Sequence, residues 1–228
     1  MGAEARSVVL VAGLAVLAAV RASAEPPGSV VDTLHNLSVS GPGEVRATSE
    51  TQVCKFCHVP HTATLPVPLW GHRLSDTAAY GVPEVTGGGK AARPAPQPDG
   101  SSRLCLSCHD GTVALGDLGR NGRIPMRGEQ RLTPGRRGYL GTDLSGSHPI
   151  SIVMPSTDQG SDDAADMGLR PVEALAADRA VKLDKEGKLQ CTTCHDPHSD
   201  RNYAPGRVPR FWVKATVEDV CLACHQLR

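Results

Sequence analysis

Cys54-Lys-Phe-Cys57-His58 is the first of four stretches that share the frame Cys-x-x-Cys-His. The others are Cys105-Leu-Ser-Cys108-His109, Cys191-Thr-Thr-Cys194-His195 and Cys221-Leu-Ala-Cys224-His225, and we number the four motifs in this order. Together they use all eight cysteines of the 228-residue chain. The first and third motifs continue as His-x-Pro-His, whereas the second and fourth do not. The chain therefore contains an A-B-A-B repeat, which indicates two related pairs of motifs.

The shared frame is the attachment signature of c-type haem. Its two thiols can each form a thioether to a haem vinyl group, and the adjacent imidazole coordinates the iron on one side. Disulfides and zinc ribbons are alternatives, but neither requires a histidine directly after the second cysteine. A thioredoxin-like dithiol needs a βαβ context that the sequence lacks. The sequence therefore predicts four covalently bound haem c groups. The predicted attachment points are Cys54, Cys57, Cys105, Cys108, Cys191, Cys194, Cys221 and Cys224, and the predicted proximal iron ligands are His58, His109, His195 and His225.

Each low-spin haem iron needs a second axial ligand, and the sequence holds nine histidines. Beyond the four proximal ones, the candidates for this distal position are His35, His61, His72, His148 and His198. His61 and His198 each follow a proximal histidine by three residues with a proline between. We expect His61 to serve the second haem and His198 the fourth, while His148 could serve the third. His35 and His72 compete for the first haem, and one of the two is spare or acts on another subunit.

The composition is poor in core-forming side chains, with 3% aromatic residues beside 24 Gly and 18 Pro. Four haem macrocycles would supply the missing apolar surface. We therefore expect a mostly irregular, loop-rich fold with short α-helices at the motifs, a multihaem cytochrome c fold organised around a chain of four haems. The local expectations are capping patterns at Ser49/Gln52 and Thr216/Asp219, a helix over Pro171 to Lys185, extended pieces at Ile150 to Met154 and Phe211 to Lys214, and irregular stretches at Val85 to Gly100, Thr133 to Gly146 and Ser156 to Gly168.

Residues 1–24 have the pattern of a secretory signal peptide. Arg6 precedes an apolar run, and Ala22-Ser23-Ala24 is a small-x-small cleavage site. The run has about 14 residues, fewer than the roughly 20 that span a bilayer. The expected mature chain is one tetrahaem domain, residues 25–228, with haem pair one at about 35–118, a connecting segment at about 119–188 and haem pair two at about 189–228. We expect an exported protein with no membrane span after signal removal. A formal net charge of zero gives no basic field for binding nucleic acid.

The A-B-A-B arrangement resembles multihaem cytochromes c of the doubled CxxCH type. More closely, the motifs and the residues around them resemble tetrahaem cytochromes that polymerise into extracellular electron-conducting filaments. The resemblance rests on His35-Asn-Leu-Ser, Val53 to His61, Pro68-Leu-Trp-Gly-His72, Leu104 to Leu115, Ser147-His-Pro149, Cys191 to His198 and Val220 to His225. It implies bis-histidine ligation, closely spaced haems, a homopolymer, and one axial histidine donated across the subunit interface, most plausibly His35. Redox partner proteins or extracellular electron acceptors are the expected partners.

The expected function is electron transfer without catalysis, in an extracellular filament or in the periplasm. A monomeric periplasmic shuttle is the main alternative. A haem reductase would need an open iron position, and no motif has a replaced proximal ligand such as CxxCK. A membrane-bound quinol dehydrogenase would keep an N-terminal anchor, against which the cleavage site speaks.

Overall fold

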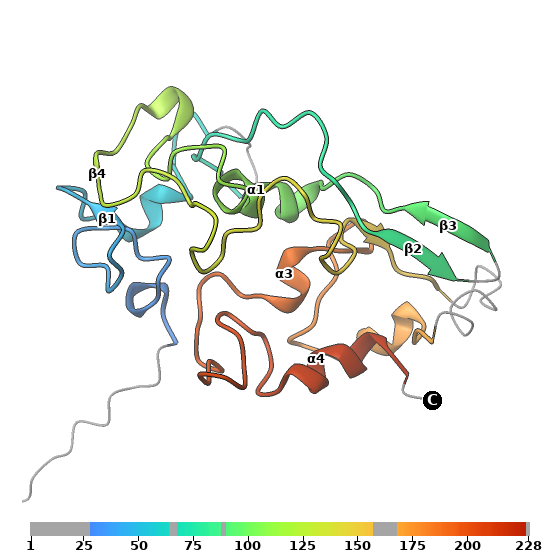
Figure 1. The fold of residues 1–228 in the computed structure, drawn as a ribbon. Coiled ribbons are helices and arrows are strands. Elements are labelled where there is room, and N and C mark those ends of the chain that lie inside the picture. Colours follow the sequence, from blue (N-terminus) through green and yellow to red (C-terminus); the bar gives the residue numbers. More distant parts are fainter. Residues whose placement is uncertain (1–27, 64–67, 88–89, 157–167, 227–228) are drawn as a thin grey trace, which may run out of the picture.

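The structure, a computed structural model, describes residues 28–63, 68–87, 90–156 and 168–226. In these residues, long loops connect short helices and strands (Figure 1). The α-helices are α1 (Gly100–His109), α3 (Cys191–Cys194) and α4 (Val217–Cys224). Single 3₁₀ turns lie at Val30–Asp32, Val53–Phe56, Gly119–Asn121 and Val172–Leu175. This confirms the loop-rich expectation with short helices.

Of the three small antiparallel sheets, two join segments that lie apart in the sequence and one is a hairpin. The strand β1 (Arg46–Ala47) pairs with β4 (Met126–Arg127), β2 (Glu84–Gly87) with β3 (Lys90–Pro94), and β5 (Ile152–Val153) with β6 (Lys188–Leu189). In register, Ala47 lies opposite Met126, and Ile152 lies opposite Leu189. The sheets thus fix loops rather than form a core layer.

Each motif lies on or beside one of these short elements. The first motif begins within the 3₁₀ turn Val53–Phe56, the second ends α1, the third forms α3, and the fourth ends α4. Thr216 caps α4, because its hydroxyl oxygen accepts the Asp219 N–H at 3.1 Å. The expected cap at Ser49/Gln52 is wrong, since the turn begins after Gln52 without a side-chain capping bond.

Three other local expectations differ from the structure. Residues 171–185 form one 3₁₀ turn instead of a helix, because Asp178 Oδ1 accepts the backbone N–H groups of Ala180 and Val181 and bends the chain. The segment from Phe211 is not a strand, since Phe211 has φ +62°. The stretch expected to be irregular from Val85 holds the β2–β3 hairpin instead. By contrast, the extended piece at 150–154 is confirmed by β5.

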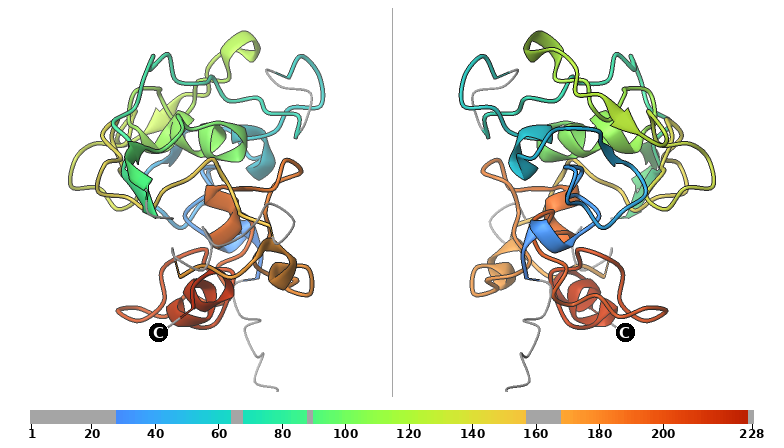
Figure 2. Two further views of the ribbon diagram at one scale, coloured as in Figure 1. Left: turned by 90° about the vertical axis from the view of Figure 1, so that its right-hand side faces the viewer. Right: turned by 90° about the vertical axis from the view of Figure 1, so that its left-hand side faces the viewer.

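Two separate apolar clusters lie beneath the two pairs of motifs. The N-terminal cluster consists of Ala47, Phe56, Leu115, Leu118, Ile124 and Met126, with Cys57 and Cys108 packed against it. The C-terminal cluster consists of Met154, Leu175, Val181, Leu189, Val220 and Cys224, with Cys194 packed against it. Figures 1 and 2 show α1, α3 and α4 following one another from top to bottom of the molecule. The motif-bearing helices therefore form a row.

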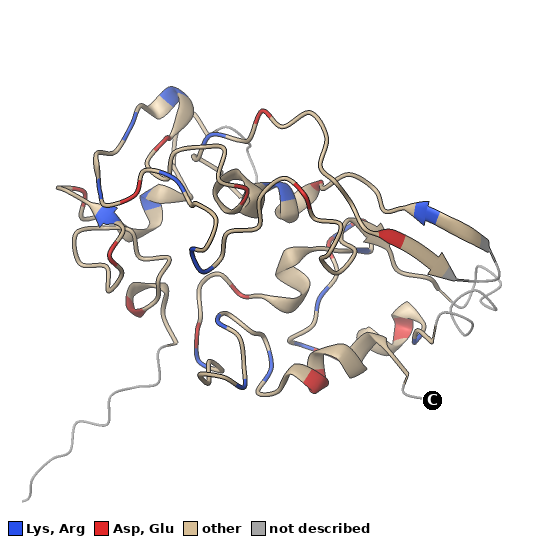
Figure 3. Ribbon diagram, in the orientation of Figure 1, with Lys and Arg blue, Asp and Glu red and all other residues tan. Residues whose placement is uncertain are grey.

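Charged side chains of both signs are interspersed along the ribbon (Figure 3). Among the described residues, no helix has the length and apolar character needed to span a bilayer. The signal-peptide prediction falls on residues 1–24, and most of the stretch expected to be irregular at 156–168 is also outside the described residues.

Candidate functional site

Backbone carbonyl groups orient most of the candidate imidazoles. In five rings other than that of His72, Nδ1 lies 2.6–3.2 Å from a carbonyl oxygen, which can only accept a hydrogen bond. Nδ1 therefore carries the proton, and Nε2 keeps its lone pair for a metal ion. The pairs are His58 with Pro68 O, His109 with Gly138 O, His195 with Arg210 O, His35 with Pro197 O, and His148 with Pro149 O.

Three proximal histidines of the motifs each face a second histidine. The ring centroids are 6.1 Å apart for His58 and His198, 6.0 Å for His109 and His35, and 6.2 Å for His225 and His148. A metal–imidazole bond is about 2 Å long, so an ion held between two Nε2 atoms separates the ring centroids by about 6 Å. The three spacings fit an iron between each pair of rings, and the chain's residues therefore suit bis-histidine haem.

Burial keeps the imidazole of His35 in the form that binds a metal. Burial, reinforced by the neighbouring His109, lowers the pKa of His35 to about 4. The His35 ring also stacks on Phe211, with centroids 4.2 Å apart and planes 12° apart. His35 is thus neutral at pH 7 and held in place on both sides.

The pairs differ from those expected from the sequence. His198 faces the first motif instead of the fourth, His148 the fourth instead of the third, and His35, expected as the donor to another subunit, faces His109 of its own chain. From the sequence, each distal histidine is expected to bind the haem of a motif nearby in the chain. In the fold, the loop after the third motif packs back onto the N-terminal half, and this brings His198 to His58.

His195 of the third motif is the exception. Its ring lies against Trp212, with centroids 5.0 Å apart, and no second imidazole faces it among the described residues, which include all nine histidines. Burial lowers the pKa of His195 as well. His61, the remaining histidine of a His-x-Pro-His sequence, is exposed and has no ring contact among the described residues. The third motif and His61 are thus both left without a partner imidazole.

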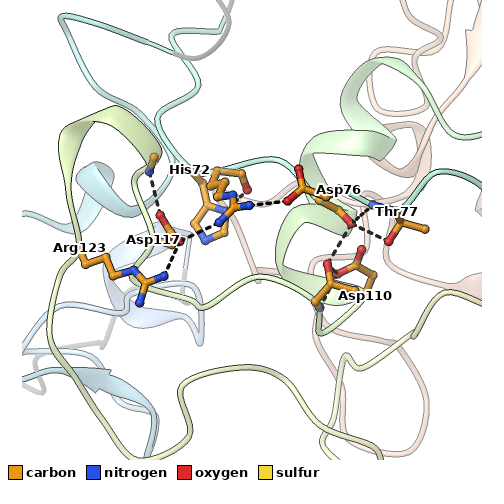
Figure 4. A network of polar contacts seen from close by, with 10 residues as sticks. His72, Asp76, Thr77, Asp110, Asp117 and Arg123 are labelled. Atoms are coloured by element: carbon orange, nitrogen blue, oxygen red, sulfur yellow. Dashed lines mark hydrogen bonds and ion pairs between the residues drawn. The ribbon is translucent and has the colours of Figure 1, made fainter.

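His72 lies in a network of polar contacts (Figure 4) and not opposite a proximal histidine. Its side chain is fully buried, with Nδ1 2.9 Å from Arg73 O and Nε2 3.1 Å from Ala114 O. Its Nε2 is also 3.5 Å from the Cys108 sulfur. Nearby, Asp117 forms ion pairs with Arg73 and Arg123. The surroundings of His72 are those of a structural histidine beside the second motif.

Two buried carboxylates that sequence reasoning missed hold the loops behind the proximal histidines. Asp110, next to His109, accepts hydrogen bonds from the Tyr80 hydroxyl and the Thr112 N–H, both at 2.8 Å. Asp200 forms an ion pair with Arg210, whose carbonyl oxygen orients His195. No local pattern marks either residue, because each partner is distant in sequence or lies in a loop.

The thiols of successive motifs lie next to one another in sequence order. Cys57 lies close to Cys108, Cys105 lies close to Cys191, and Cys194 lies close to Cys221 and Cys224. The eight cysteines are free of disulfides. Burial raises the pKa of Cys57 and that of Cys194 to about 11 each, so both are neutral thiols at pH 7 before attachment. The described residues hold no cluster of three or more His, Cys, Asp or Glu side chains of the kind that binds a metal ion directly.

A family model for the doubled CXXCH motif matches residues 185–227, which contain the third and fourth motifs. No curated protein is significantly similar to the chain. CXXCH motifs indicate covalently bound haem c, and the doubled motif indicates haem-binding electron transfer. Together with the repeated frames, the match supports a multihaem c-type cytochrome.

Proposed function

We propose that this protein transfers electrons through four covalently bound haems with bis-histidine ligation. The observation that carries the proposal is the 6.0–6.2 Å separation of three pairs of imidazoles, each with one member in a CXXCH motif. An iron with two histidine ligands has no vacant position for a substrate, which leaves one-electron transfer and no catalysis. Histidine on both sides, without a methionine thioether, favours a low reduction potential.

The order of the attachment sulfurs supports a route through the molecule in sequence order. Cys57 and Cys108 connect the first and second motifs, Cys105 and Cys191 the second and third, and Cys194 and Cys224 the third and fourth. Electrons would enter or leave at the first and fourth motifs. The partners would be redox proteins or extracellular electron acceptors.

The unpartnered His195 supports assembly into a homopolymer. One copy has an exposed imidazole at His61 and a motif histidine, His195, that no other imidazole of the chain faces. A second copy could supply its own His61 to this position, and repetition of that contact would give an extracellular filament. The signal-peptide pattern of residues 1–24 supports export.

The same observation favours a second candidate function. If no ligand from another copy reaches the iron at His195, that iron has an open position, as a haem reductase requires. A monomeric periplasmic shuttle is a further alternative in which the position is filled by a weak ligand or by water. The spin state of this haem in the native assembly separates the candidates.

We expect His61→Ala to abolish polymer formation and to leave one haem of four high-spin. The polymer would be measured by electron microscopy and sedimentation of native protein, and the spin state by electron paramagnetic resonance. Thr62→Ala, at the adjacent exposed position, is the matched control and should polymerise normally. Wild-type protein that stays monomeric at all concentrations would overturn the filament, and normal polymers of His61→Ala would exclude His61 as the donor. A high-spin haem in the wild-type polymer would favour the reductase.

A further inference from the structure

A buried polar cluster joins the two halves of the molecule between the second and third motifs. Ser102, on α1, is fully buried, and its hydroxyl donates to Gln190 Oε1 at 2.6 Å. The same hydroxyl oxygen accepts the backbone N–H of Cys191 at 3.0 Å. The Ser102 side chain, on the helix of the second motif, is therefore hydrogen-bonded to the backbone of Cys191, the first cysteine of the third motif.

Gln190, 1% exposed, is held by hydrogen bonds at both ends of its amide. Its Oε1 also accepts from the Ser151 hydroxyl at 3.2 Å, while Nε2 donates to Asp99 and to Asp184, each at 2.8 Å. Every amide position thus has a partner, and a fully satisfied buried network is rigid and specific. A change in any member would leave a buried polar group unpaired.

The backbone at the start of α1 is shaped for the same contact. Gly100 has φ +48°, and a Cβ at this position would lie 2.7 Å from Gln190 Nε2. Glycine therefore permits both the left-handed conformation and the close approach. At the surface, the Ser101 and Thr192 hydroxyl oxygens are 2.7 Å apart and add a second link between the two helices.

The contacts between the second and third motifs differ from those within each pair of motifs. Cys57 and Cys108 pack against the N-terminal apolar cluster, and Cys194 and Cys224 belong to the C-terminal one. Neither apolar cluster includes Cys105 or Cys191, and the two motifs are linked instead by the hydrogen bond from the Cys191 N–H to the Ser102 hydroxyl. Apolar packing thus fixes the spacing within each motif pair, and hydrogen bonds fix it between the pairs.

We propose that Ser102 and Gln190 are positioning residues that set the separation of the second and third haems, and so control electron passage between the two halves. The proposal rests on the proposed electron-transfer function. The residues act through Cys191: they hold its backbone against α1 and thereby place its sulfur beside Cys105. Among the described residues, neither Ser102 nor Gln190 contacts a histidine predicted to bind iron.

The test is Ser102→Ala in the haem-loaded protein. We expect four attached low-spin haems, a weaker bisignate Soret circular-dichroism band, and stopped-flow reduction that splits into two phases of two haems each. Ser107→Ala is the matched control, because Ser107 is fully buried on the same helix but its hydroxyl contacts Leu104 O and Cys108 of that helix and no residue of the third motif. The fourth motif has Ala223 at the corresponding position. This control should keep the wild-type band and a single phase.

Ser101→Ala is a milder companion that removes the surface link and should change the band in the same direction by a smaller amount. It keeps the proposal testable if Ser102→Ala does not fold. A wild-type band and single-phase reduction in Ser102→Ala, or in Ser101→Ala should Ser102→Ala not fold, would overturn the positioning role. A wild-type protein without attached haem or without a bisignate band would instead refute the electron-transfer function itself.

Discussion

His198→Ala will leave four haems attached to the chain and will turn the haem of the first motif, not that of the fourth, high-spin. The His198 ring faces His58 at 6.1 Å, although 140 residues separate them in the sequence. His58 is fixed by Pro68 O and stays in place without its partner. The loss of one axial ligand therefore falls on the N-terminal half while the substitution lies in the C-terminal half.

Electron paramagnetic resonance would count the high-spin irons in His198→Ala. Nuclear magnetic resonance of the haem methyl groups would assign the altered haem through its contacts with residues of the first or the fourth motif. His148→Ala is the control, because it should affect the haem at His225 in the same way. A high-spin haem at the fourth motif in His198→Ala would contradict the fold-back pairing, and an unchanged low-spin spectrum would remove His198 from the ligand set.

The second large effect is loss of folding when haem is withheld. Residues 25–228 produced without haem attachment should show no cooperative thermal transition and rapid proteolysis. Only 40 of these 204 residues are Leu, Ile, Val or Phe. Each of the two main apolar clusters contains just six buried residues. A chain with so few bulky side chains cannot bury enough apolar surface to offset the entropy of ordering its loops.

Circular dichroism during heating and timed proteolysis would measure this effect, with the haem-loaded protein in the same buffer as the reference. A sharp transition of the haem-free chain, with native-like protection, would contradict the idea that haem replaces the missing core.

Local features of this protein could be predicted from its sequence, and long-range ones could not. The four frames, the short motif helices and the Thr216 cap each depend on residues within one or two turns. The predicted helix from Pro171 to Lys185 is wrong, because the side chain of Asp178 accepts a backbone N–H and bends the chain. Pattern and propensity alone do not report such competition.

The ligand pairs and the buried cluster depend on how the halves pack. Nothing near His198 in the sequence indicates that its partner is His58, because the contact exists only after the loop packs back. In the sequence, Gln190 and Ser102 are ordinary polar residues ahead of two motifs. They become informative only in the fold, which brings these residues, 88 positions apart, to a distance of 2.6 Å between Ser102 Oγ and Gln190 Oε1. The positions of the histidines and cysteines in the sequence therefore predict haem binding, whereas only the fold shows which residues pair with one another.

The most direct test of the account is the intact mass of the native protein together with its pyridine haemochrome spectrum. The account predicts a polypeptide that carries four haem masses, with a spectrum of haem bound through two thioethers in every case, and no free thiol. Fewer than four haems per chain, or cysteines paired in disulfides, would contradict it.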